Sequence, residues 1–251
     1  MSKITIGRQF CGPPNSGNGG YVCGVLAKGH EGPVTAVLRA PIPLDAELDL
    51  EARDGGQALL GAEGALIAQG RAATQELPEP PPAPSLEAAR AAATRHIGLA
   101  QRVHPICFTC GTAREDGDGL RVLPGQLDGA EAGVVACTWT AHANFAGADG
   151  VIAPEVVWAA LDCPGYFAWV EKEGRHGALL GTMTAEVVAP VRAGEEYAVV
   201  AWPISKDGRK EVAGVAMFDG AGRLVGRAHQ VWIVIGSLPP AAASTPAAAT
   251  A

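Results

Sequence analysis

The stretch Asn18-Gly-Gly-Tyr-Val-Cys-Gly-Val-Leu-Ala27 opens with a glycine pair and continues as an apolar run. A second stretch, Ala153-Pro-Glu-Val-Val-Trp-Ala-Ala-Leu-Asp162, has the same length and is also mostly apolar. Each stretch predicts one buried helix. The chain has 251 residues, a length that suits one large domain or two small ones, and two similar helices favour two units.

The segments that follow these helices repeat in the same order. Val37-Leu-Arg-Ala-Pro41 and Glu186-Val-Val-Ala-Pro190 end in prolines that lie 149 residues apart, and Glu47 and Glu196 share that spacing. One such match could arise by chance, but several in the same order indicate a duplicated fold.

A proline-rich stretch, Pro78-Glu-Pro-Pro-Pro-Ala-Pro84, separates the two units and predicts a stiff, extended linker. Ser85 is a candidate helix cap, so we expect a connecting helix over 85–96. The expected organisation is an N-terminal half over 1–77, a linker and connecting helix over 78–100, a C-terminal half over 101–237, and a disordered Ala/Pro tail over 238–251.

Each unit reads as a short strand, one helix and then several longer strands. In the second unit the strands are expected at Thr182–Val188, Tyr197–Pro203, Glu211–Asp219 and Val225–Ile235, all rich in Val, Ile, Ala and Trp. Turn residues lie between neighbouring strands, as in Arg53-Asp-Gly-Gly56 of the first unit, and indicate antiparallel pairing. One helix against an antiparallel sheet is an α+β layer architecture.

The composition argues against two kinds of partner. The net charge is −7, the pI is about 5.4 and no basic run stands out, so a nucleic-acid partner is not expected. No window reaches ~18 uninterrupted apolar residues, so we expect no membrane span. The opening residues, MSKITIGRQF, lack the basic and apolar regions of a signal peptide, which favours a cytoplasmic protein.

The cysteines are scattered and predict reduced thiols: Cys11, Cys23, Cys107, Cys110, Cys137 and Cys163. Cys107-Phe-Thr-Cys110 is a CxxC pair, but no second pair lies at zinc spacing. We therefore predict structural thiols and no metal site, with a redox or metal-binding role as the alternatives.

The order of elements resembles the hotdog fold, in which a sheet wraps a central helix. The motif His104-Pro-Ile-Cys-Phe-Thr-Cys-Gly111, followed by Gly119-Leu-Arg-Val122, resembles the opening of phenylacetyl-CoA-type thioesterases. Asn144-Phe-Ala-Gly147 and the helix running to Asp162 resemble their central loop and helix, and Arg192 to Trp232 resembles their last three strands. The resemblance implies an α+β tandem (double) hotdog fold in which two fused halves do what a dimer does elsewhere.

The two helices differ in the groups that thioester chemistry needs. The first starts with Gly19-Gly20, whose backbone N–H groups are unobstructed, but it carries Ala27 seven residues later. The second starts with Pro154, which has no N–H to donate, but it carries Asp162 seven residues after Glu155. One helix has the donor and the other has the acid.

In hotdog dimers the glycine end of one helix faces the acid of the other. The resemblance therefore implies one catalytic site per chain, made of Gly19 or Gly20 and Asp162. The N–H groups would stabilise charge on the thioester oxygen, and Asp162 would act as a base or a nucleophile. A second site would pair Pro154 with Ala27 and be inactive.

Other polar residues are candidates for substrate binding. Asparagines flank the two helix starts, and three cations of one hairpin turn could meet the phosphates of coenzyme A, which an acidic protein must bind with locally placed cations. These candidates are Asn15, Asn18, Asn144, Lys206, Arg209 and Lys210. All of them are also ordinary turn residues, so a solvent-exposed role is the alternative.

Several alternatives remain open at the level of sequence. The glycine pair could be only a tight turn, and Asp162 could cap a helix or form a salt bridge. Hotdog hydratases carry a histidine shortly after their aspartate, and none follows Asp162, which argues against that activity. A chain that binds acyl-CoA or an acyl-carrier protein without turnover is the main alternative. We expect no cofactor apart from the coenzyme A of the substrate, and double-hotdog chains could pair further into a homo-oligomer.

Overall fold

The computed structural model describes residues 2–101 and 104–236 of the chain. The strands are β1 (Ser2–Thr5), β2 (Val34–Leu38), β3 (Glu47–Arg53), β4 (Gly56–Leu60), β5 (Leu66–Ala72), β6 (Gly125–Gln126), β7 (Val135–Thr140), β8 (Gly177–Val187), β9 (Glu196–Asp207), β10 (Lys210–Phe218) and β11 (Leu224–Gly236). The α-helices are α1 (Gly19–Ala27), α2 (Leu86–Ala93), α3 (Ile97–Gln101), α4 (Pro154–Ala160) and α5 (Cys163–Glu173).

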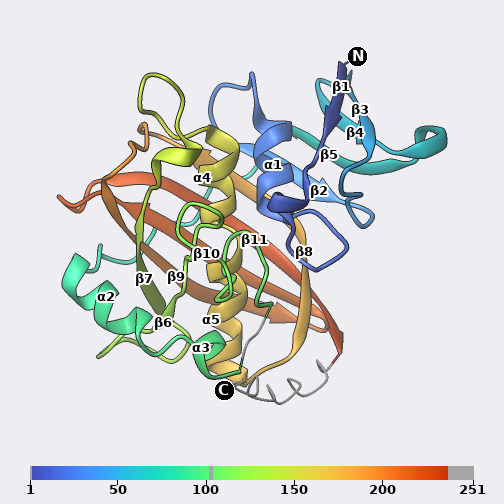
Figure 1. Ribbon diagram of the computed structural model, residues 1–251. Helices are drawn as coiled ribbons and strands as arrows, with labels where there is room; N and C mark the ends of the chain where they lie inside the picture. Colours follow the sequence, from blue (N-terminus) through green and yellow to red (C-terminus); the bar gives the residue numbers. More distant parts are fainter. Residues whose placement is uncertain (1, 102–103, 237–251) are drawn as a thin grey trace, which may run out of the picture.

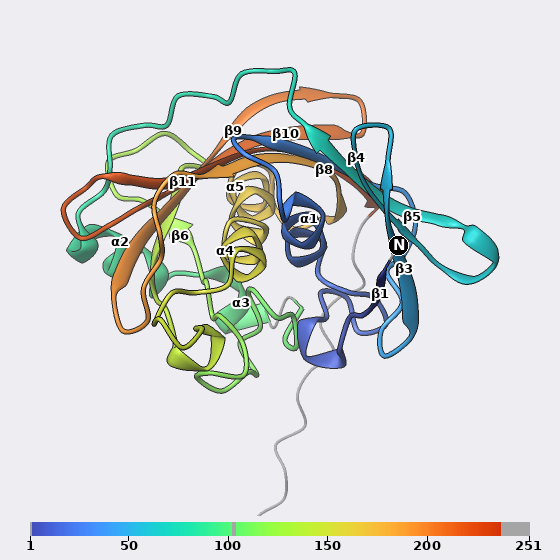
Figure 2. The same cartoon turned by 90° about the horizontal axis from the view of Figure 1, so that it is seen from above.

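Within the described ranges the strands form one eleven-stranded sheet in the order β1-β3-β4-β5-β2-β8-β11-β10-β9-β7-β6. The sheet arches around α1, α4 and α5; α1 lies beside α4, and α5 follows α4 end to end (Figures 1 and 2). Helix α2 packs on the other face, where Ala89 and Ala92 are fully buried with Ala198 and Val200 of β9. The intervening residue of β9, Val199, belongs to the main core, as expected when side chains alternate between the faces of a strand.

The strand order is symmetrical about the central pair β2–β8. Strands β5, β4, β3 and β1 follow on one side, and β11, β10, β9 and β7 follow on the other, where the two-residue strand β6 is added at the edge. Thr35 of β2 is the register partner of Thr184 of β8, and their hydroxyl oxygens lie 2.9 Å apart. These threonines are 149 residues apart, which is the spacing of the sequence repeat. The repeat therefore corresponds to two similarly built halves that join through equivalent strands.

The expected strands and caps of the described residues are present. Strands β8 to β11 match the four predicted for the second half. The turn between β3 and β4 places Asp54 and Gly55 at φ values of 50° and 74°, the left-handed region that turn residues tolerate. The Ser85 hydroxyl accepts a hydrogen bond from Ala88 N–H at 3.1 Å, so the capping prediction is confirmed, although α2 ends earlier than expected. The predicted tail over 238–251 lies outside the described residues.

The second helix differs from the prediction. The sequence placed Asp162 within one helix, but α4 ends at Ala160 and α5 begins at Cys163. Pro164 explains the break, because proline has no N–H to bond the carbonyl four residues earlier. Asp162 therefore lies at a corner between two helices. No helix among residues 2–101 and 104–236 is long and apolar enough to span a membrane.

Candidate active site

The start of α1 meets the corner between α4 and α5. The backbone N–H of Gly20 donates a hydrogen bond of 2.9 Å to Oδ2 of Asp162, across 142 residues of sequence. The contact joins the glycine end of the first half to the carboxylate of the second half. These are the two elements that the family resemblance implied would face each other.

Asp162 is buried without a charged partner among the groups that contact it. Its residue is only 3% exposed, and its second oxygen, Oδ1, is buried with no hydrogen-bond partner among the described residues. Burial raises the pKa of Asp162 to about 7, while the Gly20 N–H and the Asn18 amide act in the opposite direction. A carboxyl group with a pKa near neutrality can accept and return a proton under ordinary conditions.

The helix start leaves one backbone donor unused. Asn18 caps α1 by accepting a hydrogen bond from Tyr21 N–H at 2.9 Å, and the Gly20 N–H is taken by Asp162. The Gly19 N–H has no partner among the described residues. Gly19 is also less buried than Gly20, so its N–H is the helix-start donor that a substrate oxygen could use.

Glycine is required where α1 crosses α4. A methyl group added to Gly20 would lie 2.5 Å from the Cβ of Asp162 and 2.8 Å from the carbonyl oxygen of Trp158. One turn later, a methyl group added to Gly24 would lie 2.5 Å from the Cα of Glu155. The two helices therefore touch along glycines, which brings the Gly20 backbone within hydrogen-bonding distance of Asp162.

A cover segment, which we define as residues 104–124, closes this end of the helix pair. Thr109 accepts a hydrogen bond from the Asn18 amide at 3.3 Å and donates one to the Ala159 carbonyl at 2.8 Å. Phe108 is fully buried, and its N–H bonds the Cys11 carbonyl at 2.7 Å. The cover segment is thus bonded to both helices around Asp162.

Gln230 of β11 supports the corner and was not singled out from the sequence. Its amide nitrogen donates to the carbonyl oxygens of Leu161 and Asp162 at 2.6 and 2.8 Å, and its oxygen accepts from the Trp232 indole at 2.8 Å. These bonds give the Leu161 carbonyl a donor at the break between α4 and α5 and add a second donor to the Asp162 carbonyl, which also accepts a 3.4 Å bond from Gly165 N–H. The sequence offers one signal for this role, which is a glutamine within the mostly apolar segment of β11. A polar side chain that is buried needs a hydrogen-bond partner.

The opposite end of the helix pair is built differently. Ala27 of α1 and Pro154 of α4 line an open cavity of about 520 Å³, together with Val157, Trp158 and the segment 186–191. Glu155 is buried here as well, but Lys28 neutralises it through an ion pair of 2.6 Å. The cavity lining does not include Asp162 or the glycine pair.

Comparison with known proteins identifies the fold. No protein-family model and no curated protein matches the sequence. Among solved structures, the tesB protein of Mycobacterium avium subspecies paratuberculosis aligns over 91% of this chain and 89% of its own, with 15% identity and a TM-score of 0.57. A candidate thioesterase from Novosphingobium aromaticivorans aligns over 93% and 95%, with 15% identity and a TM-score of 0.59. The fold is a double hotdog. The fold class expected from the sequence is confirmed.

The double hotdog does not bring all predicted binding residues to the Asp162 corner. Asn18 is there, next to the cover segment. Asn15 is exposed in the loop before α1, and Asn144 is exposed and bonds the Gly117 carbonyl at 3.1 Å.

The three basic residues lie at the far end of α5. Lys206 belongs to β9 rather than to a turn, and it is bonded to Glu173 and Glu211. Glu173 ends α5, roughly 16 Å along the helix from Asp162 at 1.5 Å per residue. Arg209 and Lys210 are exposed beside the same hairpin turn. A phosphate group on this hairpin would therefore belong to a ligand that extends well beyond the Asp162 corner.

Proposed function

We propose that this double-hotdog chain hydrolyses an acyl-CoA or acyl-carrier thioester at the site formed by the start of α1 and Asp162. The observation that carries the proposal is the hydrogen bond between Gly20 N–H and Asp162. It brings a helix-start donor from one half to a buried carboxylate from the other half. The names of the two solved structures with the same fold, a tesB protein and a candidate thioesterase, support the same class of reaction.

The proposed reaction uses Asp162 as the base. Its unpartnered Oδ1 accepts a proton from a water molecule, and the water oxygen attacks the thioester carbon. The carbonyl oxygen gains negative charge, which the Gly19 N–H stabilises at the positive end of α1. The carbon–sulfur bond then breaks, and the leaving thiolate takes the proton from Asp162. One water is consumed, and a free acid and a thiol are released.

Substrate entry in this proposal requires the cover segment to move. Thr109 and Phe108 fill the space around the helix start, and each is fully buried. A thioester that approaches Gly19 therefore has to displace part of residues 104–124. The Thr109 hydroxyl bonds the Asn18 side chain and the Ala159 carbonyl, and both bonds are lost when the cover segment moves away. Hydrogen bonds to the substrate can replace them.

The test is thioester hydrolysis measured by release of free thiol. The panel runs from acetyl-CoA to palmitoyl-CoA, with phenylacetyl-CoA, benzoyl-CoA and an acyl-carrier thioester added. We expect wild type to turn over at least one class, and Asp162→Asn to lose ~100-fold or more of that turnover, the size expected for a positioned base. Glu155→Gln is the matched control, because it neutralises a buried acid at the opposite end, and it should stay within about twofold of wild type. Equal losses in both variants, or no thiol release from any substrate, would contradict the proposal.

A second function is favoured by the position of the open cavity. The cavity of about 520 Å³ lies at the end that has neither the glycine pair nor Asp162, and such a volume suits a small ligand. The second candidate is therefore binding of an acyl-CoA without turnover. Val188→Trp separates the candidates, because Val188 lines the cavity and is 53% exposed. Loss of acyl-CoA binding in this variant, with no thiol release by wild type, would favour the binding protein.

A further inference from the structure

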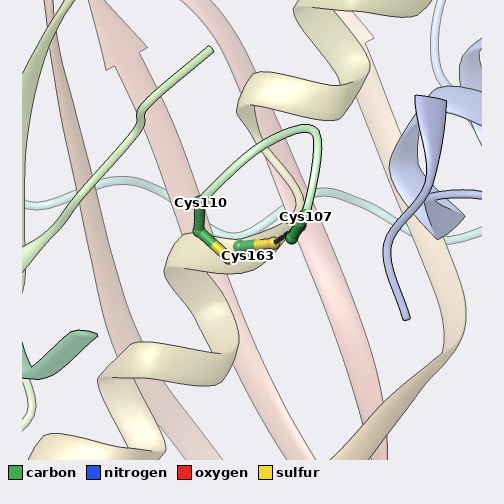
Figure 3. A group of neighbouring side chains, drawn as sticks. All are labelled: Cys107, Cys110 and Cys163. Atoms are coloured by element: carbon green, nitrogen blue, oxygen red, sulfur yellow. Dashed lines mark hydrogen bonds between the residues drawn. The ribbon is translucent and has the colours of Figure 1, made fainter. Parts of the chain in front are cut away.

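Three cysteines from two distant segments meet beside the Asp162 corner (Figure 3). Cys107 and Cys110 belong to the cover segment, and Cys163 is the first residue of α5. Their sulfur atoms all lie within 4.8 Å of one another, and those of Cys107 and Cys163 are 3.7 Å apart. All three side chains are free thiols and are buried. We call this group the thiol cluster.

The protein places a hydrogen-bond donor and a tight loop at Cys107. The Asn18 side-chain amide donates a hydrogen bond of 4.0 Å to the Cys107 sulfur. The loop then closes with a bond of 2.8 Å from Gly111 N–H to the Cys107 carbonyl. A methyl group added to Gly111 would lie 2.4 Å from that carbonyl oxygen, so this tight turn requires glycine. A hydrogen bond donated to a sulfur favours its charged form over the neutral thiol.

The sulfur separations suit one thiophilic metal ion. At a zinc–sulfur distance of about 2.3 Å and a tetrahedral angle, neighbouring sulfurs are about 3.8 Å apart. One pair of the thiol cluster already has this separation, and the other pairs need shifts of about 1 Å or less. Three thiols held this close in the interior form a donor set that matches the preference of soft metals for thiolates.

We propose that Cys107, Cys110 and Cys163 form a three-thiolate zinc site. Among residues 2–101 and 104–236, no fourth cysteine, histidine or carboxylate lies within the same distance, so the fourth position is left to water or another small ligand. Three thiolates with Zn²⁺ leave one net negative charge, whereas Cu⁺ would leave two, and a buried charge is costly. The Asn18 amide at Cys107 and the N-terminus of α5 at Cys163 offset part of the remaining charge.

A metal at this position would join the cover segment to the start of α5. Cys107 and Cys163 are 56 residues apart, so one ion would close a long loop directly beside Asp162. Because the ligands are deprotonated and preassembled only in the folded protein, zinc binding would add to the stability of the fold. The proposal concerns zinc binding alone and does not depend on thioester hydrolysis.

The test measures metal content and metal binding. The full-length chain, reduced and stripped of metal, is titrated with zinc and separately with cobalt, which reports thiolate ligation through charge-transfer absorption. We expect one equivalent per chain, a thiolate–cobalt absorption, and a midpoint of thermal unfolding that rises with zinc concentration. Cys163→Ser and Cys110→Ser should weaken zinc binding by at least about tenfold. Cys137→Ser, which removes a buried cysteine outside the cluster, should bind as wild type does.

Three results would overturn the zinc site. The first is a reduced wild-type chain that takes up neither metal. The second is equal zinc affinity in Cys163→Ser, Cys137→Ser and wild type. The third is a disulfide between Cys107 and a neighbour that forms in air, in a chain that still takes up no zinc after reduction. That last result would identify the cluster as a redox pair. The cobalt spectrum is recorded on wild type, so it decides the question even if a serine variant fails to fold.

Discussion

The two ends of the α1–α4 pair are built from equivalent positions but have opposite properties. At one end the Gly20 N–H bonds Asp162, and the protein closes tightly around them. At the other end Ala27 and Pro154 line a cavity of about 520 Å³. The two similarly built halves thus give two equivalent ends with different properties: one has a backbone donor bonded to a buried carboxylate, and the other has an open cavity.

The two ends of the α1–α4 pair each contain a buried acid, and the surroundings of these two acids differ. Asp162 and Glu155 are 3% and 8% exposed, and each has one oxygen without a hydrogen-bond partner among the described residues. Glu155 is neutralised by Lys28, whereas the hydrogen bond to Asp162 comes from a neutral backbone N–H. A paired charge contributes to structure, but a buried charge without a counter-ion is costly and is kept mostly where it has a function.

Alanine substitutions at Gly20 and Gly24 should distinguish an effect on helix packing from an effect on thioester hydrolysis. Both substitutions to alanine place a methyl group about 2.5 Å from α4 or its corner, so each should destabilise the fold by about 1–3 kcal/mol. Only Gly20→Ala displaces Asp162 from the helix start, so it should also lose ~100-fold of thioester turnover per folded molecule. Thermal unfolding and turnover are measured on both variants. Gly7→Ala is the control, since its methyl group meets nothing closer than 4.0 Å. Equal turnover in the two variants would mean that the contact has no catalytic role.

Removing the amide of Gln230 should weaken the corner that holds Asp162. Gln230→Met keeps the length of the side chain but removes the donor to the Leu161 carbonyl and, among the described residues, leaves the Asp162 carbonyl with only the 3.4 Å bond from Gly165 N–H. A buried group left unsatisfied costs about 1–3 kcal/mol, so the free energy of unfolding should fall by at least that much. Chemical denaturation measures the change, with Gln101→Met as the exposed control. A loss below about 0.5 kcal/mol would show that these carbonyls find other partners.

Neutralising Asp162 should stabilise the protein while it removes activity. In Asp162→Asn the side-chain oxygen can still accept the Gly20 N–H, but the buried charge is gone. We expect a gain of about 1 kcal/mol, or a rise of about 2–4 °C in the midpoint of unfolding. Glu155→Gln should lower the midpoint slightly, because it leaves Lys28 without its partner. A drop in both variants would indicate that Asp162 is a structural acid like Glu155.

Local patterns that repeat predicted two equivalent halves, whereas the family resemblance implied the double-hotdog fold and the principal contact. The glycine pair, the apolar run and the prolines 149 residues apart predicted two equivalent halves, and the pairing of Thr35 with Thr184 has the same spacing. The structure brings Gly20 to Asp162 as the family resemblance implied.

Contacts between distant segments could not be predicted in the same way. The carbonyls that Gln230 bonds lie at the break between α4 and α5, which the sequence did not predict. The thiol cluster needs Cys163, which is 56 residues from Cys107 and shares no spacing motif with it. The bonds from Thr109 to both helices likewise depend on how the cover segment folds over them.

The prediction with the smallest expected effect asks whether the cavity end of the α1–α4 pair lacks a backbone N–H donor as well as an acid. Ala27→Asp, made in the inactive Asp162→Asn background, restores a carboxylate at the equivalent position, but Pro154 still has no N–H to donate. We therefore expect no recovery of thioester turnover. Adding Pro154→Gly to Ala27→Asp supplies a helix-start N–H next to a cavity that is already open, and a detectable fraction of turnover should return. Recovery with Ala27→Asp alone would show that the acid suffices and that the backbone donor is dispensable. The pair of variants thus tests directly whether hydrolysis needs both groups that the intact corner brings together.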